Sequence, residues 1–176
     1  WEAYSFTGKF SLERASMLKN LANVYKAMAD YDQTDKMLKA ALEIYRSKGK
    51  KLDELIVLGE LASSAYYQMR WERAISLNLK VIRGLKKLDD KKFLAIQQQR
   101  LANIYYSLDK YDAAIKVYRE SMLYYDSQPN ELLNAGYIRI ALGDSYFQSG
   151  DFKRAAILYL NAAEKLKNID VSKYWL

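Results

Sequence analysis

The chain has 176 residues, of which 51% are hydrophobic, so it is long enough to bury a core of ordinary size. Aromatic residues make up 14%, whereas seven glycines and the single Pro129 are too few turn residues for an all-β sandwich. The sequence has no apolar run of membrane-spanning length, and its first ten residues do not resemble a signal peptide. These features predict an ordered, mostly helical protein.

Cysteine and histidine are both absent, which removes thiolate and imidazole nucleophiles, the usual zinc ligands and any disulfide. The sequence also lacks a phosphate-binding glycine loop, a dinucleotide fingerprint and a nucleophile elbow. Paired carboxylates such as Asp30 with Asp32 lie in predicted turns, where helix capping explains them. We therefore expect no enzymatic activity, no metal site and no cofactor.

One sequence phrase recurs four times. Each copy starts with a leucine and a small residue, has an aromatic or small residue four positions after the leucine, and then an aromatic and a second small residue. The copies begin at Leu21, Leu61, Leu101 and Leu142, so their offsets are 40, 40 and 41 residues. Such regularity predicts an internal repeat.

Each copy contains two stretches of helical apolar spacing on either side of a short break, which predicts two amphipathic helices joined by a tight turn. In chain order the breaks are residues 29–33, 68–72, 108–112 and 149–153. Gly150, Asp30, Asp109 and Asp151 are residue types that end a first helix or cap a second. Small residues are expected to let the paired helices approach closely: Ala22, Ala62, Ala102 and Gly143.

The predicted repeats cover about residues 15–50, 55–90, 95–128 and 131–169. Asn130 is expected to cap the helix that starts near Glu131. One hairpin cannot bury its apolar face alone, so the repeats must stack, and we predict a single solenoid domain over residues 1–176. Counting by the repeat length places Trp1 and Leu176 inside further repeats, so we expect a fragment of a longer protein.

The stretch Ile140–Ala163, IALGDSYFQSGDFKRAAILYLNAA, resembles the tetratricopeptide repeat (TPR) superfamily, and the resemblance covers about residues 15–170. It implies an all-α, right-handed superhelical solenoid of four helix-turn-helix repeats. The period exceeds the common TPR period of about 34 residues and is similar to that of kinesin light chains, spindle-orientation adaptors of the Leu-Gly-Asn type and peptide-sensing bacterial regulators. The tryptophan of the fourth motif position is replaced by Leu18, Leu58, Gln98 and Arg139.

The resemblance implies a protein–protein interaction scaffold or adaptor that binds a peptide or partner helix in a concave groove lined by the first helices. Four mostly polar residues occupy the ninth motif position: Asn23, Ser63, Asn103 and Asp144. An asparagine amide can pair with both the donor and the acceptor of a peptide backbone. The alternative interpretation is that these are ordinary polar residues on a wet helix face.

The twelfth motif position carries three aromatic residues and one lysine: Lys26, Tyr66, Tyr106 and Phe147. The aromatics are candidates for stacking on an apolar side chain of a ligand. Alternatively, they pack against the first helix of the next repeat.

Four basic residues are candidate contacts for a carboxylate or acidic side chain of the ligand: Lys19, Lys26, Arg100 and Arg139. Gln99 completes the predicted peptide-binding set. The carboxylate clamp of chaperone-binding TPR domains is matched at Lys19, Asn23 and Arg100 only. Glu60 and Ile96 depart from it, and Glu60 would place a negative charge at the carboxylate site.

The net charge of +7 raises nucleic acid as a partner. The basic residues gather at the ends of second helices and in loops, where they suit solvated helix C-termini. We therefore expect protein or peptide partners and no membrane span. A peptide-responsive sensor controlling an effector domain, a basic nucleic-acid scaffold and self-association through the repeat ends are the alternatives. The compartment stays open, with the cytoplasm favoured.

Overall fold

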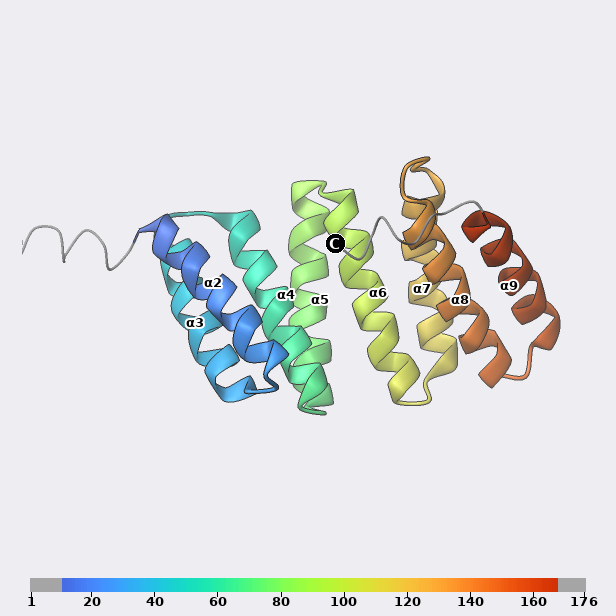
Figure 1. Cartoon of the computed structure of the whole chain (residues 1–176), viewed down its shortest axis with the longest axis horizontal. Coiled ribbons are helices and arrows are strands. Elements are labelled where there is room, and N and C mark those ends of the chain that lie inside the picture. Colours follow the sequence, from blue (N-terminus) through green and yellow to red (C-terminus); the bar gives the residue numbers. More distant parts are fainter. Residues whose placement is uncertain (1–10, 168–176) are drawn as a thin grey trace, which may run out of the picture. The chain divides into compact units, whose positions relative to one another are not determined.

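The structure is a computed structural model that describes residues 11–167. This part of the chain forms eight α-helices and no strand, in four helical hairpins (Figure 1). The helices are α2 Leu12–Ala27, α3 Tyr31–Ser47, α4 Lys51–Tyr67, α5 Trp71–Leu88, α6 Lys91–Ser107, α7 Tyr111–Asp126, α8 Leu132–Gln148 and α9 Phe152–Leu166. The prediction of an all-α fold built from four helix-turn-helix repeats is confirmed.

The turn inside each hairpin has the same backbone design. The first helix ends at a residue with left-handed backbone, with φ of 57°, 55°, 55° and 86° at Ala29, Met69, Asp109 and Gly150 respectively. Asp30 then caps α3, because its carboxylate accepts a hydrogen bond from the Gln33 amide at 3.0 Å. Asp151 caps α9 in the same way. The positions predicted for these turns are confirmed.

The expected cap at Asn130 is wrong. Helix α8 begins at Leu132, and the residue before it is Glu131, whose side chain forms no capping hydrogen bond. Its carboxylate instead accepts hydrogen bonds from Lys92 at 2.5 Å and from Asn134 at 2.6 Å. The hydrogen bond from Lys92, and then that from Asn134, hold the pKa of this carboxyl below its usual value.

Small residues allow the two helices of each hairpin to approach closely. Ala22, Ala62 and Ala102 are buried, each with at most 1% of its surface exposed. A Cβ atom added at Gly143 would lie 2.8 Å from the Tyr159 ring of the facing helix, closer than van der Waals contact permits. The predicted role of this position is confirmed.

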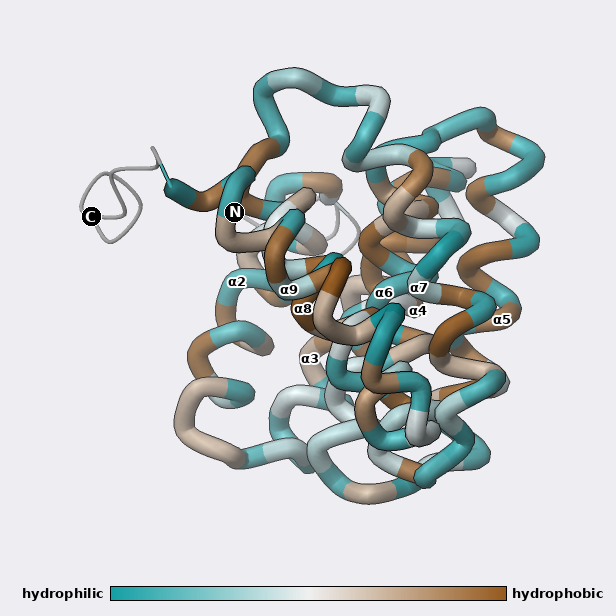
Figure 2. Tube along the Cα trace, turned by 90° about the vertical axis from the view of Figure 1, so that its right-hand side faces the viewer, coloured by the Kyte–Doolittle hydropathy of each residue, from teal (hydrophilic) through white to brown (hydrophobic). Residues whose placement is uncertain are grey.

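The helices group into two compact units, one ending at Asp89 and the other beginning at Asp90. The first holds α2–α5 around buried residues such as Leu38, Val57 and Leu85. The second holds α6–α9 around Ile138 and Leu142. Hydrophobic and hydrophilic residues alternate along the helical turns, as amphipathic helices require (Figure 2). The single solenoid domain remains a prediction.

None of the helices in the described range has the length and apolarity needed to cross a membrane.

Candidate functional site

The four residues of the ninth motif position lie near the ends of the first helices. Asn23 of α2 and Ser63 of α4 belong to the first unit, whereas Asn103 of α6 and Asp144 of α8 belong to the second. The two asparagines are exposed, and Ser63 and Asp144 are half-buried. In both units this position therefore presents polar atoms at or near the surface.

In the second unit, tyrosines of the second helices hold these residues in place. Tyr118 donates a hydrogen bond from its hydroxyl to Asn103 Oδ1 at 2.5 Å, and Tyr159 does the same to Asp144 Oδ1 at 2.7 Å. Tyr118 is only 2% exposed, so the bond joins a buried phenol to a surface amide. This arrangement fixes the orientation of both polar side chains.

The tyrosine bonds decide which atoms are left for a ligand. With Oδ1 bonded to the phenol, the Asn103 amide group turns its nitrogen, a donor, away from Tyr118. Asp144 keeps its second carboxylate oxygen, an acceptor. Burial, followed by the hydrogen bond to Asp144, raises the pKa of Tyr159 to about 12, so this phenol stays a donor at neutral pH.

The first unit lacks these tyrosines. Tyr118 and Tyr159 are the eighth residues of α7 and α9. The same position in the second helices of the first unit is Leu38 in α3 and Asn78 in α5. Neither carries a hydroxyl, so Asn23 and Ser63 have no phenol to orient them. Sequence analysis missed the tyrosines as site residues, although both stand 15 residues after the side chain that they orient.

The aromatic residues of the twelfth position pack within their own repeat. Tyr106 meets the Tyr111 ring edge to face, with centroids 5.6 Å apart, and Phe147 meets Phe152 at 5.3 Å. Tyr66 contacts Trp71 in the same geometry. In each case the ring partner is the first residue of the second helix, and packing against the next repeat stays a prediction. Phe147 still exposes 51% of its surface.

Two of the predicted cationic contacts already have partners inside the chain. Lys26 forms an ion pair with Glu60 at 2.6 Å, joining α2 to α4. Arg139 is 9% exposed, pairs with the Asp126 carboxylate and donates to the Ala135 carbonyl oxygen at 2.8 Å. The prediction that Arg139 faces a ligand is corrected, because a buried arginine committed to its own ion pair is not available to one. Lys19, Gln99 and Arg100 are half-buried.

Two models of the tetratricopeptide repeat match the chain, one over residues 13–87 and the other over residues 98–125. The chain belongs to the tetratricopeptide repeat superfamily. The family was identified correctly from the repeated phrase. No significant match was found among curated protein sequences.

Several solved TPR structures share the fold. BtubC from P. vanneervenii is 19% identical with a TM-score of 0.80, over 87% of this chain and 63% of its own. A Rap protein solved in complex with competence and sporulation factor is 16% identical with a TM-score of 0.78, over 89% of this chain and 44% of its own. This chain therefore spans less than two thirds of either protein.

A third structure, from Podospora anserina, is described as nearly identical TPR-like repeats of a putative kinesin light chain. It is 15% identical with a TM-score of 0.72, over 92% of this chain and 76% of its own. The TM-scores show that these proteins and this chain share the solenoid fold.

The TPR carboxylate clamp fits this chain poorly. Glu60, which departs from the clamp pattern, is joined to Lys26 in an ion pair. A ligand carboxylate at this place would meet a neutralised pair in which the cation is already engaged, and it would have to compete with Glu60 for Lys26.

The basic clusters of this TPR chain are partly neutralised. Arg46 and Lys51 both bond to the Glu54 carboxylate, at 3.2 Å and 2.9 Å. Lys92 pairs with Glu131. The remaining lysines and arginines at the second-helix ends are exposed, including Lys48, Lys86 and Lys87. Nucleic-acid binding by these residues stays an untested alternative to the predicted protein or peptide partner.

Proposed function

We propose that this chain is a protein-interaction module that binds an extended peptide segment of a partner protein across the first helices of its repeats. TPR membership supports an interaction or scaffolding role over catalysis. The Rap structure with competence and sporulation factor supports ligand binding by a related fold. The partner, the peptide sequence and the binding mode are all part of the proposal.

The observation that carries the proposal is the pair of tyrosine-oriented side chains in the second unit. Asn103 offers a donor and Asp144 an acceptor, on successive first helices α6 and α8. An extended peptide alternates carbonyl acceptors and amide donors along its backbone. Asn103 would donate to a peptide carbonyl, and Asp144 would accept from a peptide amide. Orientation before binding lowers the entropy cost of recognition.

Other members of the predicted set would add to this pair. Exposed Phe147 would contact an apolar side chain of the peptide, and Tyr106 would support it from α6. Lys19 and Arg100 would favour a peptide that carries acidic groups. In the first unit Asn23, Ser63 and Tyr66 would continue the contacts, and Gln99 would complete them.

The test is affinity capture of partners from the native extract at two salt concentrations. The bait is the wild-type chain, compared with the Asn103→Ala variant and the Asn23→Ala/Arg100→Ala/Asn103→Ala variant. A matched variant, Tyr118→Phe, keeps the ring in the core and removes only the hydroxyl that orients Asn103. We expect a protein partner that persists at higher salt, is lost with the triple change and is weakened by Tyr118→Phe.

Two results would contradict the proposal. Partners captured equally by every variant would place binding on another surface. Nucleic acid that is captured at low salt and released at higher salt would favour the basic-scaffold alternative, because phosphate contacts lose affinity steeply with salt.

A further inference from the structure

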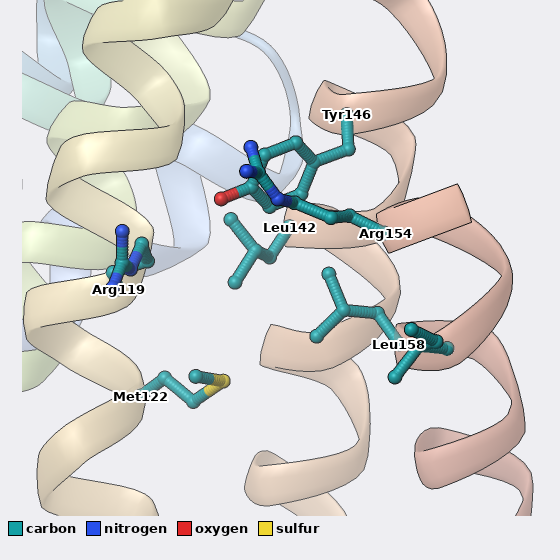
Figure 3. Close-up of a pocket in the computed structure, with 7 residues that line it drawn as sticks. Arg119, Met122, Leu142, Tyr146, Arg154 and Leu158 are labelled. Atoms are coloured by element: carbon teal, nitrogen blue, oxygen red, sulfur yellow. The ribbon is translucent and has the colours of Figure 1, made fainter. Parts of the chain in front are cut away.

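The second unit has a pocket of about 380 Å³ on its second helices, away from the ninth-position residues. It lies between α7 and α9, with side chains of α8 between them (Figure 3). Its lining includes Arg119, Met122, Leu142, Tyr146, Arg154 and Leu158. A neighbouring hollow of about 420 Å³ shares Arg119 and Met122 and adds Leu123. We refer to the first of these as the α7–α9 pocket.

In the first unit a hollow of about 410 Å³ lies between the second helices, and an ion pair of the chain's own residues lines it. Arg73, the third residue of α5, binds Asp35, the fifth residue of α3, at 2.8 Å. Asp35 also accepts a hydrogen bond from the Ser64 hydroxyl at 2.7 Å and is 6% exposed. A built-in carboxylate therefore neutralises the arginine between the two second helices.

The second unit keeps the arginine and lacks the carboxylate. Arg154 is the third residue of α9, but the fifth residue of α7 is Ile115. Arg154 instead pairs with Asp151 of its own helix cap at 3.0 Å and lies over the Tyr146 ring, 5.4 Å from its centroid. Its side chain remains 65% exposed. An exposed pair within one helix turn is weak, so Arg154 can exchange its partner.

The surroundings of the pocket are basic and apolar. Arg119 makes no ion pair with any carboxylate of the described residues, and no acidic residue lines the α7–α9 pocket. Ile157, which also lines the pocket, exposes 58% of its surface, and Leu123 of the neighbouring hollow exposes 71%. The neighbouring hollow does carry two acidic residues, Asp112 and Glu120. Of these two hollows, only the α7–α9 pocket has basic residues in its lining without acidic ones.

We infer that the α7–α9 pocket docks a segment of a partner protein in which an aspartate or glutamate stands beside a large apolar residue. The partner carboxylate binds Arg154 and Arg119, as Asp35 binds Arg73 in the first unit. The apolar side chain fills the pocket against Met122, Leu142 and Leu158. A charge-assisted arginine bond next to a buried apolar anchor is the combination that concentrates binding energy at interfaces. This surface is separate from Asn103 and Asp144.

The test starts from a phage-displayed library of random dodecapeptides selected against the whole chain, with counter-selection against the Arg154→Gln variant. We expect the enriched peptides to combine an acidic residue with Leu, Phe or Trp. A synthetic enriched peptide should bind Arg154→Gln about tenfold more weakly than wild type in fluorescence anisotropy. Replacing its acidic residue with the corresponding amide should have a similar effect.

The sharpest variant is Ile115→Asp, which gives α7 the carboxylate that Asp35 supplies in α3. It should pair with Arg154 and weaken peptide binding about tenfold relative to Ile115→Asn, which has the same shape without charge. Comparing these two variants separates pairing from any loss of apolar packing, and circular dichroism of both verifies folding. Tyr118→Phe should leave this binding unchanged, which distinguishes it from the proposed function.

The inference is overturned if no enriched peptide discriminates Arg154→Gln, or if the enriched peptides carry no acidic residue. Two further results would overturn the partner-protein assignment and show that something else occupies the pocket. Self-association of the chain that Ile157→Glu abolishes, measured by sedimentation equilibrium, would make it a second copy. Competition by a synthetic peptide of residues 168–176 would make it a segment of this chain.

Discussion

Four residues with left-handed backbone end the first helices of the four repeats, and only one of them is glycine. Ala29, Met69 and Asp109 adopt φ of 55–57°, and Gly150 adopts 86°. This conformation lets the backbone amide that follows reach back into the last helical turn, as in the bond from Arg70 N to Ala65 O at 2.9 Å. A side chain at such a position costs about 1–2 kcal/mol.

Met69→Gly should therefore stabilise the protein. The Met69 side chain is 72% exposed, so its removal loses little packing. Relief of backbone strain outweighs the greater freedom that glycine has in the unfolded chain, which leaves a net gain of about 0.5–1 kcal/mol. Urea unfolding followed by circular dichroism measures it.

The reverse change, Gly150→Ala, serves as the control. Nothing lies within 4 Å of the Cβ that alanine would add, so the substitution tests the backbone alone. We expect a loss of about 1 kcal/mol. Equal stability of both variants and wild type would mean that the turn tolerates any residue.

Gln97 should be replaceable with a gain in stability. It is fully buried, and neither polar atom of its amide has a partner among the described residues. It is the seventh residue of α6, a place taken by Val57 in α4 and Ile138 in α8. Gln97→Met keeps an unbranched side chain and should raise the free energy of unfolding by about 1–3 kcal/mol. A lower value in urea unfolding would contradict this view of the site.

Helices α7 and α9 contribute to the candidate site through their buried faces. Buried Tyr118 and half-buried Tyr159 donate hydrogen bonds to the polar side chains of α6 and α8. The packing of the second helix in each of these hairpins thus determines which polar atoms the first helix offers to a ligand. Binding and hairpin stability are coupled at this level, because one side chain serves both.

The protein should lose stability at alkaline pH. The pKa of Tyr159 is raised to about 12, chiefly by burial and then by its bond to Asp144, and burial raises the pKa of Tyr125 to about 12 as well. An unfolded tyrosine releases its proton near pH 10. The stabilisation is therefore complete below pH 10 and is lost as the pH rises from 10 through 12.

Urea unfolding at a series of pH values measures this loss. The Tyr159→Phe variant should show a shallower decline than wild type between pH 10 and 12, since one of the two groups is gone. An identical decline in both proteins would show that Tyr159 titrates alike when folded and unfolded.

The division of the helices into two compact units bears on cooperativity. In repeat arrays, stability is the sum of each repeat and its contacts with neighbours. Ile138→Ala removes a fully buried side chain of the second unit, with an expected cost of about 2–5 kcal/mol. Hydrogen exchange should accelerate in α6–α9 more than in α2–α5. Val57→Ala is the matched change in the first unit, and equal acceleration everywhere would indicate a single cooperative unit.

The sequence by itself determined the repeat number, the helix-turn-helix form and the family. These follow from local patterns, namely apolar spacing, small residues at close helix contacts, and aspartate or glycine at turns, which repeat at a nearly constant offset. Asn130 was the exception, because α8 begins at Leu132 and Glu131 precedes it, with its carboxylate bonded to Lys92 and Asn134. Nothing within the loop sequence predicts a partner 39 residues away.

The tertiary structure decided which site residues already have partners. Arg139, Lys26 and Asn103 all looked available from the motif positions, but their partners lie 13, 34 and 15 residues away. Asp35 and Ile115 occupy the same position of their helices, but only the structure shows that Asp35 pairs with Arg73 and that Ile115 leaves Arg154 without such a partner on α7. Pairing across helices depends on the side chains of the facing helix, and one helix's spacing pattern does not contain that information.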